Sequence, residues 1–447
     1  MKKQFTILST KLIQKASKMS GKAGSTTPGH IAKKIDKDIL EKMRKNVENV
    51  IFVSGTNGKT TTSQVLAAIL TEDSGPLVHN IEGANMLAGI TTAFVTSQNI
   101  KGNKKYKYAV IEIDEGSIEK VFKEIKPDYF VFTNFFRDQL DRFGEIDMLV
   151  DKIKNQLDDK EIQLLLNVDD PYTRRLSNGK NTTYFGIGVD AYNFGKQTTI
   201  ESTYCPKCGE KLHYKKIHYG QLGHYSCFSC TFKRPDEKYK TTKIELNNGI
   251  NLQINYQNFE TNIFGDYNAM NIAGAIATAK ELGIKNNVIQ NALTKLFITN
   301  GRMEYIKFDD KNILLNLAKN PAGLNVSFEN IKNLNGEKNV LLLLNDNGAD
   351  GRDISWIWDA DFESLKEMNV NHFYCSGLRA EELALRLKYA GIEEGKISID
   401  KDIKDVLKKS IEKTENLFVI PNYTLLETTR KEILKLQNEY NRKEASK

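Results

Sequence analysis

Short apolar runs alternate with segments of helical periodicity along most of the chain. The clearest runs are Val50–Val53, Tyr108–Ile113, Tyr129–Asn134 and Gln163–Asn167. Runs of this length, separated by segments with helical spacing of apolar residues, predict buried strands that alternate with helices. The alternation is typical of an α/β domain with a mostly parallel sheet.

The alternation is interrupted once and then returns in the last third of the chain. The stretch at about residues 202–235 lacks both the apolar runs of buried strands and the helical periodicity, and it is expected to be an insertion. Further apolar runs at Ile313–Leu317 and Val340–Leu344 predict a second, smaller α/β domain. We therefore expect a basic helical segment at residues 1–45, a central domain at residues 46–306 and a C-terminal domain at residues 307–447.

The first apolar run leads into Gly-Thr-Asn-Gly-Lys-Thr-Thr-Thr and then into a helix predicted over Thr60–Leu70. A strand, a glycine turn and a helix N-terminus form a phosphate cradle, because backbone N–H groups converge there and the helix end is partly positive. Lys59 can reach the β- and γ-phosphates, and the Thr60 hydroxyl can bind Mg²⁺. The sequence therefore predicts ATP binding by Gly55, Thr56, Asn57, Gly58, Lys59, Thr60 and Thr61.

Polar side chains follow the other predicted strands. They are Glu112, Asp114, Glu115, Asn134 and Asp138. Ligands of open parallel sheets bind at the carboxyl ends of the strands. We therefore expect these side chains on the same rim as Lys59.

Four of the five cysteines form two Cys-x-x-Cys pairs, Cys205 with Cys208 and Cys227 with Cys230. Two such pairs, 18 residues apart, predict one tetrahedral Zn²⁺ held by four thiolates, as in a zinc ribbon. A redox-active pair would explain one Cys-x-x-Cys but not two. Nearby lysines would permit nucleic-acid binding, but an insertion inside an ATPase more often serves packing or docking, so no nucleic-acid partner is expected.

The chain of 447 residues carries a net charge of +7, and no apolar run approaches the length of a membrane span. The basic N-terminus lacks the continuous apolar core of a signal peptide, so a cytoplasmic location is expected. Lysines alternate with apolar residues over the first 22 positions. The pattern fits a solvated helix packed on the protein. It also fits a basic amphipathic helix on an anionic membrane, which would place the protein at the inner face of the cell membrane.

Six ordered blocks resemble the Mur ligase superfamily, which includes folylpolyglutamate synthase. The blocks are Gly55–Thr62, Thr133–Gly144, Asn167–Pro171, Gly265–Ala275, Asn300–Glu304 and Asn316–Gly323. The resemblance implies a Mur ligase-type P-loop ATPase domain with an inserted zinc ribbon, followed by a smaller Rossmann-like α/β domain. It implies that ATP phosphorylates a carboxylate and that an amine then attacks the acyl phosphate. By this resemblance Thr60 and Glu112 hold Mg²⁺, and Asn271 and Arg302 contact the nucleotide.

The sequence departs from the superfamily pattern at metal-related positions. Where the superfamily has a histidine in the second block, this chain has Gln139. Where it has a histidine in the last block, this chain has Lys319. The carbamylated lysine of the family falls on Ile153, which has a lysine on each side. Glu115 is the alternative carboxylate ligand for Mg²⁺. The number of catalytic metals therefore stays open.

A short N-terminus and an inserted four-cysteine ribbon resemble the synthetase subunits of the lipid II amidotransferases within this superfamily. The stretches His79–Phe94 and Leu344–Glu363 resemble them as well. The resemblance implies amidation of the D-glutamate α-carboxylate of lipid II to D-isoglutamine. Ammonia would come from a separate glutaminase subunit, GatD, which uses a cysteine and a histidine. Asp353 would be the catalytic acid that orients this histidine across the interface, beside Trp356 and Trp358. A surface turn or helix cap is the alternative for Asp353, and Asp359 and Asp361 are weaker candidates for the acid.

Two other functions remain open from the sequence. A stand-alone ligase of the folylpolyglutamate synthase type would add an amino acid without a partner. An ATPase that binds nucleic acid through its zinc ribbon would lack ligase activity and bind in a salt-sensitive manner.

Overall fold

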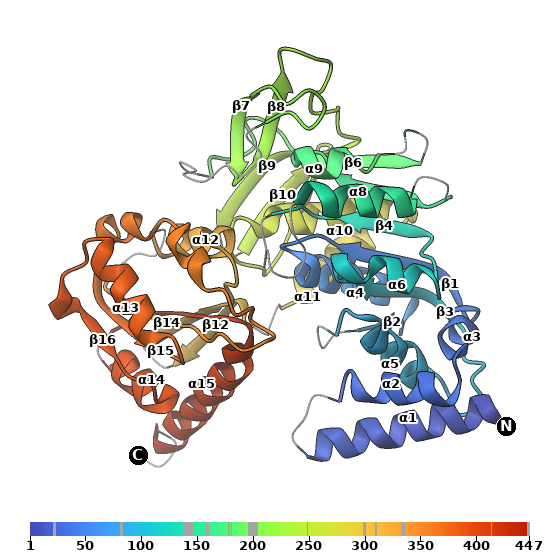
Figure 1. The fold of residues 1–447 in the computed structure, drawn as a ribbon, viewed down its shortest axis with the longest axis horizontal. Coiled ribbons are helices and arrows are strands. Elements are labelled where there is room, and N and C mark those ends of the chain that lie inside the picture. Colours follow the sequence, from blue (N-terminus) through green and yellow to red (C-terminus); the bar gives the residue numbers. More distant parts are fainter. Residues whose placement is uncertain are drawn as a thin grey trace.

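Two β-sheets organise the protein, one in the first two thirds of the chain and one in the last third (Figure 1). The computed structural model describes the whole chain except residues 21–23, 81–83, 137–145, 158–160, 178, 180, 195–203, 248, 298–300, 309–310, 333–335, 413 and 445–447.

The larger sheet has nine strands in the order β11-β10-β9-β6-β5-β4-β1-β3-β2. Every neighbouring pair from β9 to β2 is parallel, and β10 and β11 add an antiparallel edge. The strands are β1 (Val47–Ser54), β2 (Val78–His79), β3 (Tyr106–Glu112), β4 (Tyr129–Phe132), β5 (Gln163–Asn167), β6 (Thr182–Ile187), β9 (Tyr239–Asn247), β10 (Gly249–Ile254) and β11 (Gln257–Glu260). This sheet confirms the predicted α/β domain with mostly parallel strands.

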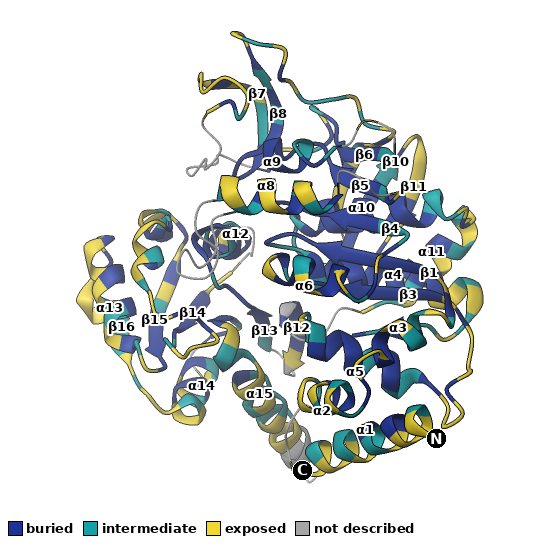
Figure 2. Ribbon diagram, turned by 45° about the vertical axis from the view of Figure 1, so that its right-hand side comes forward, coloured by how far each residue is buried: buried dark blue, intermediate teal, exposed yellow. Residues whose placement is uncertain are grey.

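Helices cover both faces of this sheet, because alternate residues of its apolar strands point to opposite sides. Ile51 and Val53 pack in one core with α4 (Lys59–Ser74), α10 (Asn268–Glu281) and α11 (Asn286–Lys295). Val50 and Phe52 pack in the other. That second core includes residues of α5 (Leu87–Ser97), α6 (Ile118–Phe122), α8 (Ile146–Leu157) and α9 (Pro171–Arg174). Figure 2 shows the buried strands lying between these helices.

Three helices precede the first strand. They are α1 (Lys2–Met19), α2 (Thr27–Ile35) and α3 (Ile39–Arg44). They pack on one another and on α5. None of the described helices combines the length and the apolar character that a bilayer crossing requires.

The second sheet has six strands in the order β12-β13-β17-β14-β15-β16, and only the pair β12–β13 is antiparallel. The strands are β12 (Arg302–Phe308), β13 (Lys311–Asn316), β14 (Lys338–Leu343), β15 (Val370–Ser376), β16 (Ile397–Ile399) and β17 (Asn416–Pro421). The packed helices include α12 (Pro321–Lys332), α13 (Ala380–Tyr389), α14 (Ile403–Glu412) and α15 (Tyr423–Glu444). Because β12 is hydrogen-bonded into this sheet, the C-terminal fold begins at Arg302, a few residues before the expected boundary at residue 306.

A two-stranded hairpin is inserted in the chain between β6 and β9, which pair directly with each other in the larger sheet. Its antiparallel strands are β7 (Leu212–Tyr219) and β8 (Leu222–Cys227), and it stands at the top of the molecule in Figures 1 and 2. The base of the hairpin is tied to the central domain by the buried ion pair between Arg234 Nε and Asp169 Oδ1, 2.8 Å apart. The hairpin lies inside the insertion expected at about residues 202–235.

Candidate functional site

The glycine loop joins β1 to α4, and both of its glycines are needed where they stand. Gly58 caps α4 with a φ of +84°, and Gly55 has a φ of +123°. A Cβ on Gly58 would lie 1.9 Å from the Asn271 side-chain oxygen, and a Cβ on Gly55 would lie 2.3 Å from Thr133 Oγ1. Only glycine fits both the left-handed backbone and the close approach. The predicted nucleotide residue Asn271 therefore lies directly against the loop.

Side chains that follow β4 hold the loop open and rigid. Thr133 Oγ1 donates to the Asn57 carbonyl oxygen at 2.7 Å, and Asn134 Nδ2 donates to the same oxygen at 3.1 Å. The Asn57 N–H donates in return to Asn134 Oδ1 at 2.9 Å. The backbone N–H of Thr56 donates to the Asn134 carbonyl oxygen at 2.8 Å. Asn134 lies on the expected rim, where it shapes the cradle.

Lys59 is the first residue of α4 and is buried in the loop. Its Nζ donates to the Gly55 carbonyl oxygen and, at 3.2 Å, to the Thr56 carbonyl oxygen. It also forms an ion pair with Glu115 at 3.2 Å. Both side chains are less than a tenth exposed. The structure thus brings two predicted site residues, Lys59 and Glu115, into direct contact.

Thr60 and Glu112 form the second pair of predicted residues in the site. Thr60 Oγ1 donates to Glu112 Oε2 at 2.8 Å. Asn85 Nδ2 donates to the other carboxylate oxygen, Oε1, at 3.1 Å. Oxygen donors of this kind are what Mg²⁺ prefers, and a hydroxyl beside a carboxylate at a phosphate loop fits that ion.

A cavity of about 320 Å³ opens above the loop, and both domains line it. Asn320 Nδ2, from the C-terminal domain, donates to Asn57 Oδ1 at 3.3 Å. The Tyr267 hydroxyl, from the central domain, donates to Asn316 Oδ1 at 3.3 Å. The lining also includes Thr56, Gly58, Lys59, Thr60, Thr61, Glu112, Asp114, Asn271 and Lys319. The expected site residues of the loop therefore face a space closed by both domains.

A second cavity of about 520 Å³ adjoins the first, and the two share Met86 and Asp114. Glu115 lines the second cavity, so the Lys59–Glu115 pair lies between the two spaces. Ile153 also lines it and is otherwise packed in the apolar core. The neighbouring Lys152 forms an ion pair with a surface glutamate, Glu119, at 3.1 Å.

Some predicted residues are not placed or only partly placed. Asp138 and Gln139 lie in 137–145, outside the described residues. Arg302 begins β12, where its backbone pairs with Asn316 at the edge of the cavity, and its side chain is not described.

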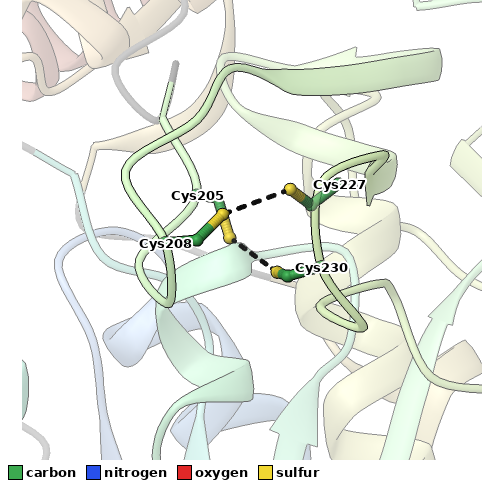
Figure 3. Close-up of side chains that lie close together, drawn as sticks. All are labelled: Cys205, Cys208, Cys227 and Cys230. Carbon is green, nitrogen blue, oxygen red and sulfur yellow. Dashed lines mark hydrogen bonds between the residues drawn. The ribbon is translucent and has the colours of Figure 1, made fainter.

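The four predicted zinc ligands converge at one end of the hairpin (Figure 3). The sulfur atoms of Cys205 and Cys230 are 3.6 Å apart, and those of Cys208 and Cys227 are 3.5 Å apart. All four sulfur atoms lie within 4.8 Å of one another. Four thiols at such distances suit a tetrahedral metal shell, and the bond lengths of Zn²⁺ to sulfur require similar spacing.

The opposite end of the hairpin reaches the cavity above the glycine loop. Tyr219 and Leu222, on either side of its turn, line the cavity. The Tyr219 ring packs 5.2 Å from the Phe136 ring, and Gln221 Nε2 donates to the Phe135 carbonyl oxygen. Sequence reasoning missed these contacts, because the turn carries no motif and its partners lie some 80 residues earlier in the chain.

Asp353 lies on the surface of the C-terminal domain, outside both cavities. Its Oδ1 accepts a hydrogen bond from the Ser355 N–H at 2.8 Å, and hydrogen bonding from Ser355 lowers the pKa of the carboxyl. A hydrogen bond from the N–H two residues further on is typical of a surface turn, which was the alternative role for Asp353. The carboxylate is nevertheless exposed and can contact another molecule. Nearby, Trp358 is half exposed and meets the Tyr389 ring edge-on at 5.6 Å, while Trp356 packs partly into the core.

The fold and the loop define the class of the protein as a Mur ligase-type enzyme. A family model of the Mur ligase middle domain matches residues 53–279, and a model of the MurT ligase C-terminal domain matches residues 317–426. The chain belongs to the MurT family within the Mur ligases, which confirms the resemblance seen in the sequence blocks.

Two proteins named as subunits of a lipid II isoglutaminyl synthase are similar to the chain over most of its length. It is 46% identical over 95% of its length to the lipid II isoglutaminyl synthase (glutamine-hydrolyzing) subunit MurT of Staphylococcus aureus, covering 96% of that protein. It is 38% identical over 90% of its length to the subunit of the same name from Streptococcus pneumoniae, covering 91% of that protein.

Solved structures share the fold at low identity. A pseudomurein peptide ligase type C from Methanothermus fervidus superposes with a TM-score of 0.68 at 24% identity, covering 90% of this chain and 81% of the other. The MurF ligase of Thermotoga maritima, solved in complex with ADP, gives a TM-score of 0.64 at 15% identity, covering 93% and 85%.

Proposed function

We propose that the protein catalyses ATP-dependent amidation of the D-glutamate α-carboxylate of lipid II to D-isoglutamine. An acyl phosphate would be the activated form of the carboxylate, and ammonia would come from a glutaminase subunit, GatD. Near full-length similarity to two subunits named for this reaction supports the proposal. The preformed phosphate loop facing a cavity between two domains is the observation of the structure that carries it.

The loop and its neighbours would bind the nucleotide. ATP with Mg²⁺ supplies the phosphoryl group when bound, and the ADP complex of the Thermotoga relative supports nucleotide binding by this fold. Lys59 would exchange its contact with Glu115 for phosphate oxygens, which neutralises charge on the transferring group. Thr60 and Glu112 would hold the Mg²⁺. Asn271, already against Gly58, would contact the nucleotide, and Arg302 is assigned the same role.

The adjoining cavity would receive the acceptor carboxylate. Asp114 and Glu115 stand at its junction with the nucleotide cavity, so a third carboxylate would meet repulsion there. The Mg²⁺ that Thr60 and Glu112 would hold with the nucleotide would offset this repulsion. The acceptor carboxylate would therefore bind best when the nucleotide is in place. Glu115 could also serve as a Mg²⁺ ligand once Lys59 has turned away from it.

Zinc would hold the ribbon together. The four sulfur atoms of Cys205, Cys208, Cys227 and Cys230 fit a Zn²⁺ shell, and the cluster buries few other apolar side chains. A metal can replace the missing core of so small a unit.

A glutaminase subunit would dock on the C-terminal domain around Asp353. The names of the relatives call them subunits of a glutamine-hydrolysing synthase, which supports the need for a partner. A Cys-His pair works best when a third group orients the imidazole, and Asp353 is an ionised, exposed acid suited to that role. The half-exposed Trp358 beside it suits the centre of an interface. The protein would act in the cytoplasm as a heterodimer with GatD.

The proposal is tested by reconstitution with the glutaminase, lipid II, ATP and glutamine. Lys59→Ala should abolish lipid II amidation, while the complex still forms and still hydrolyses glutamine. Asp353→Asn should lower glutamine hydrolysis by orders of magnitude, whereas amidation from added ammonium salt should persist. Asp359→Asn changes the competing candidate in the same exposed segment and should leave glutamine hydrolysis unchanged if Asp353 is the acid. Amidation without ATP, or full glutaminase activity in Asp353→Asn, would contradict the respective part of the proposal.

A further inference from the structure

The first helix, α1, turns a row of apolar side chains away from the protein. The row consists of Met1, Phe5, Leu8, Leu12 and Met19, each at least 43% exposed. Their spacing of three, four or seven residues places them on one face of the helix. An exposed apolar stripe of this length is unusual on a surface helix, whose apolar face normally points inward.

The opposite face already holds the helix in place. Thr6, Ile7 and Thr10 are fully buried where α1 packs on α2 and α5. Thr6 Oγ1 donates to the Lys2 carbonyl oxygen at 2.9 Å, and Thr10 Oγ1 donates to the Thr6 carbonyl oxygen at 2.6 Å. Because the hydroxyls bond within the helix, the threonines present their methyl groups to the protein. The outward stripe therefore plays no part in docking α1 on this chain.

Positive charge is concentrated beside the stripe. The first 35 residues contain eight lysines and no acidic residue, while the remaining chain has 56 basic and 57 acidic residues. The net charge of +7 thus comes from the N-terminal helices. Among the described residues, no carboxylate forms an ion pair with Lys2, Lys11 or Lys15, all on α1.

We propose that the outer face of α1 docks on the surface of an anionic phospholipid bilayer. Apolar side chains would enter the boundary of head groups and acyl chains, and the flanking lysines would contact lipid phosphates. The helix of 18 residues is about 27 Å long and would lie in the membrane plane. The helix carries charge of one sign only, which is complementary to the uniformly negative surface of an anionic bilayer.

The position of α1 suits a lipid-linked substrate, and in this respect the inference rests on the proposed function. Figures 1 and 2 both place α1 along the bottom edge of the molecule, opposite the β7–β8 hairpin. It packs on α5, and Met86, just before α5, lines both cavities of the site. One helix of 11 residues therefore links the proposed membrane face to the site.

Vesicle flotation of the full-length protein tests the proposal. We expect binding to vesicles that contain phosphatidylglycerol, weak binding to pure phosphatidylcholine, and loss of binding as salt is raised. Leu8→Ser with Leu12→Ser should weaken binding at least about tenfold, since the buried apolar area drives insertion. Lys11→Gln and Lys15→Gln should each weaken it roughly fivefold. Leu385→Ser with Ile399→Ser, two similarly exposed side chains of the C-terminal domain, should have no effect.

Three outcomes would overturn the inference. The first is that the wild-type protein fails to float with anionic vesicles. The second is that the variant with Leu8→Ser and Leu12→Ser floats as well as wild type. The third is that the outer face of α1 joins two copies of the chain. Sedimentation would reveal the last case as a dimer that the Leu8/Leu12 variant dissociates. Amidation of detergent-solubilised lipid II separates the two proposals. Absence of activity in the wild type would refute the proposed function alone, whereas the Leu8/Leu12 variant should stay active in detergent and lose activity on vesicles.

Discussion

Lys59 Nζ lies 3.2 Å from the carboxylate of Glu115, and both side chains are buried at the junction of two cavities. A buried pair of this kind costs little as long as both partners are present, but the loss of one leaves an uncompensated charge. The lysine that would bind phosphate is therefore held by a carboxylate until a nucleotide competes for it.

Removal of one partner should thus affect stability and activity differently from removal of both. Lys59→Met should lower the free energy of unfolding by about 3 kcal/mol, because Glu115 stays buried without a cation. Lys59→Met with Glu115→Gln should recover most of that stability and no amidation activity. Urea unfolding and ADP release measure the two effects. Lys107→Met, which removes a surface lysine paired with Asp73, should change neither by much. Equal destabilisation in the single and double variants would contradict the pairing.

The Thr60–Glu112 contact predicts a specific magnesium phenotype. Thr60→Val should raise the Mg²⁺ concentration for half-maximal activity at least about tenfold, because a ligand oxygen is lost. Thr62→Val is the control on the same helix. The Thr62 hydroxyl is buried without a hydrogen-bond partner among the described residues, so its loss should be nearly neutral. A normal Mg²⁺ dependence in Thr60→Val would remove this residue from the metal site.

Removal of zinc should weaken ATP binding, because the hairpin carries the cysteines at one end and the cavity-lining Tyr219 and Leu222 at the other. Cys208→Ser with Cys230→Ser should abolish bound zinc and raise the KM for ATP. Metal analysis and ATP titration of the ADP-forming reaction measure the two results. Cys375→Ser lies in the core of the C-terminal domain and should retain one zinc per chain. Zinc loss with an unchanged KM would show that the hairpin keeps its turn in place without metal.

Asp266 predicts a pH-dependent change of stability. Burial raises the pKa of this carboxyl to about 6, so the folded protein holds the proton more tightly than the unfolded chain. The stabilisation is fully present below about pH 4 and is lost as the pH rises through 6, where the ionised group costs about 3 kcal/mol.

Asp266→Asn removes this titration. The variant should be more stable than wild type at pH 7 and similar to it at pH 4, as measured by urea unfolding at both pH values. Asp190→Asn, a surface acid, is the control. A constant difference between Asp266→Asn and wild type at the two pH values would contradict the raised pKa.

Local patterns predicted the strands well. The apolar run expected at Gln163–Asn167 is β5 with the same bounds, and the run at Val50–Val53 is the centre of β1. Such runs are predictable because burial on both faces of a parallel sheet leaves a continuous apolar signal. The loop was predictable as well, because its glycines and Lys59 are close in sequence and their geometry depends mainly on the local chain.

Contacts between distant segments could not be predicted in the same way. Tyr219 reaches the cavity above the glycine loop only because the turn of the hairpin packs against Phe135 and Phe136. Asn320 meets Asn57 across 263 positions of sequence. Neither pair leaves a periodic signal, since each depends on how whole elements are packed. The pairing of Glu115 with Lys59 is similar: the sequence placed both on one rim but did not show that they touch.

The C-terminal domain supplies both Asn320, at the wall of the nucleotide cavity, and Asp353, on its outer surface. A rotation of this domain as a rigid body would therefore move both residues together. Glutamine hydrolysis at Asp353 and nucleotide binding at Asn320 would then be coupled through the movement of one domain. Ammonia would be released only when the nucleotide site is closed.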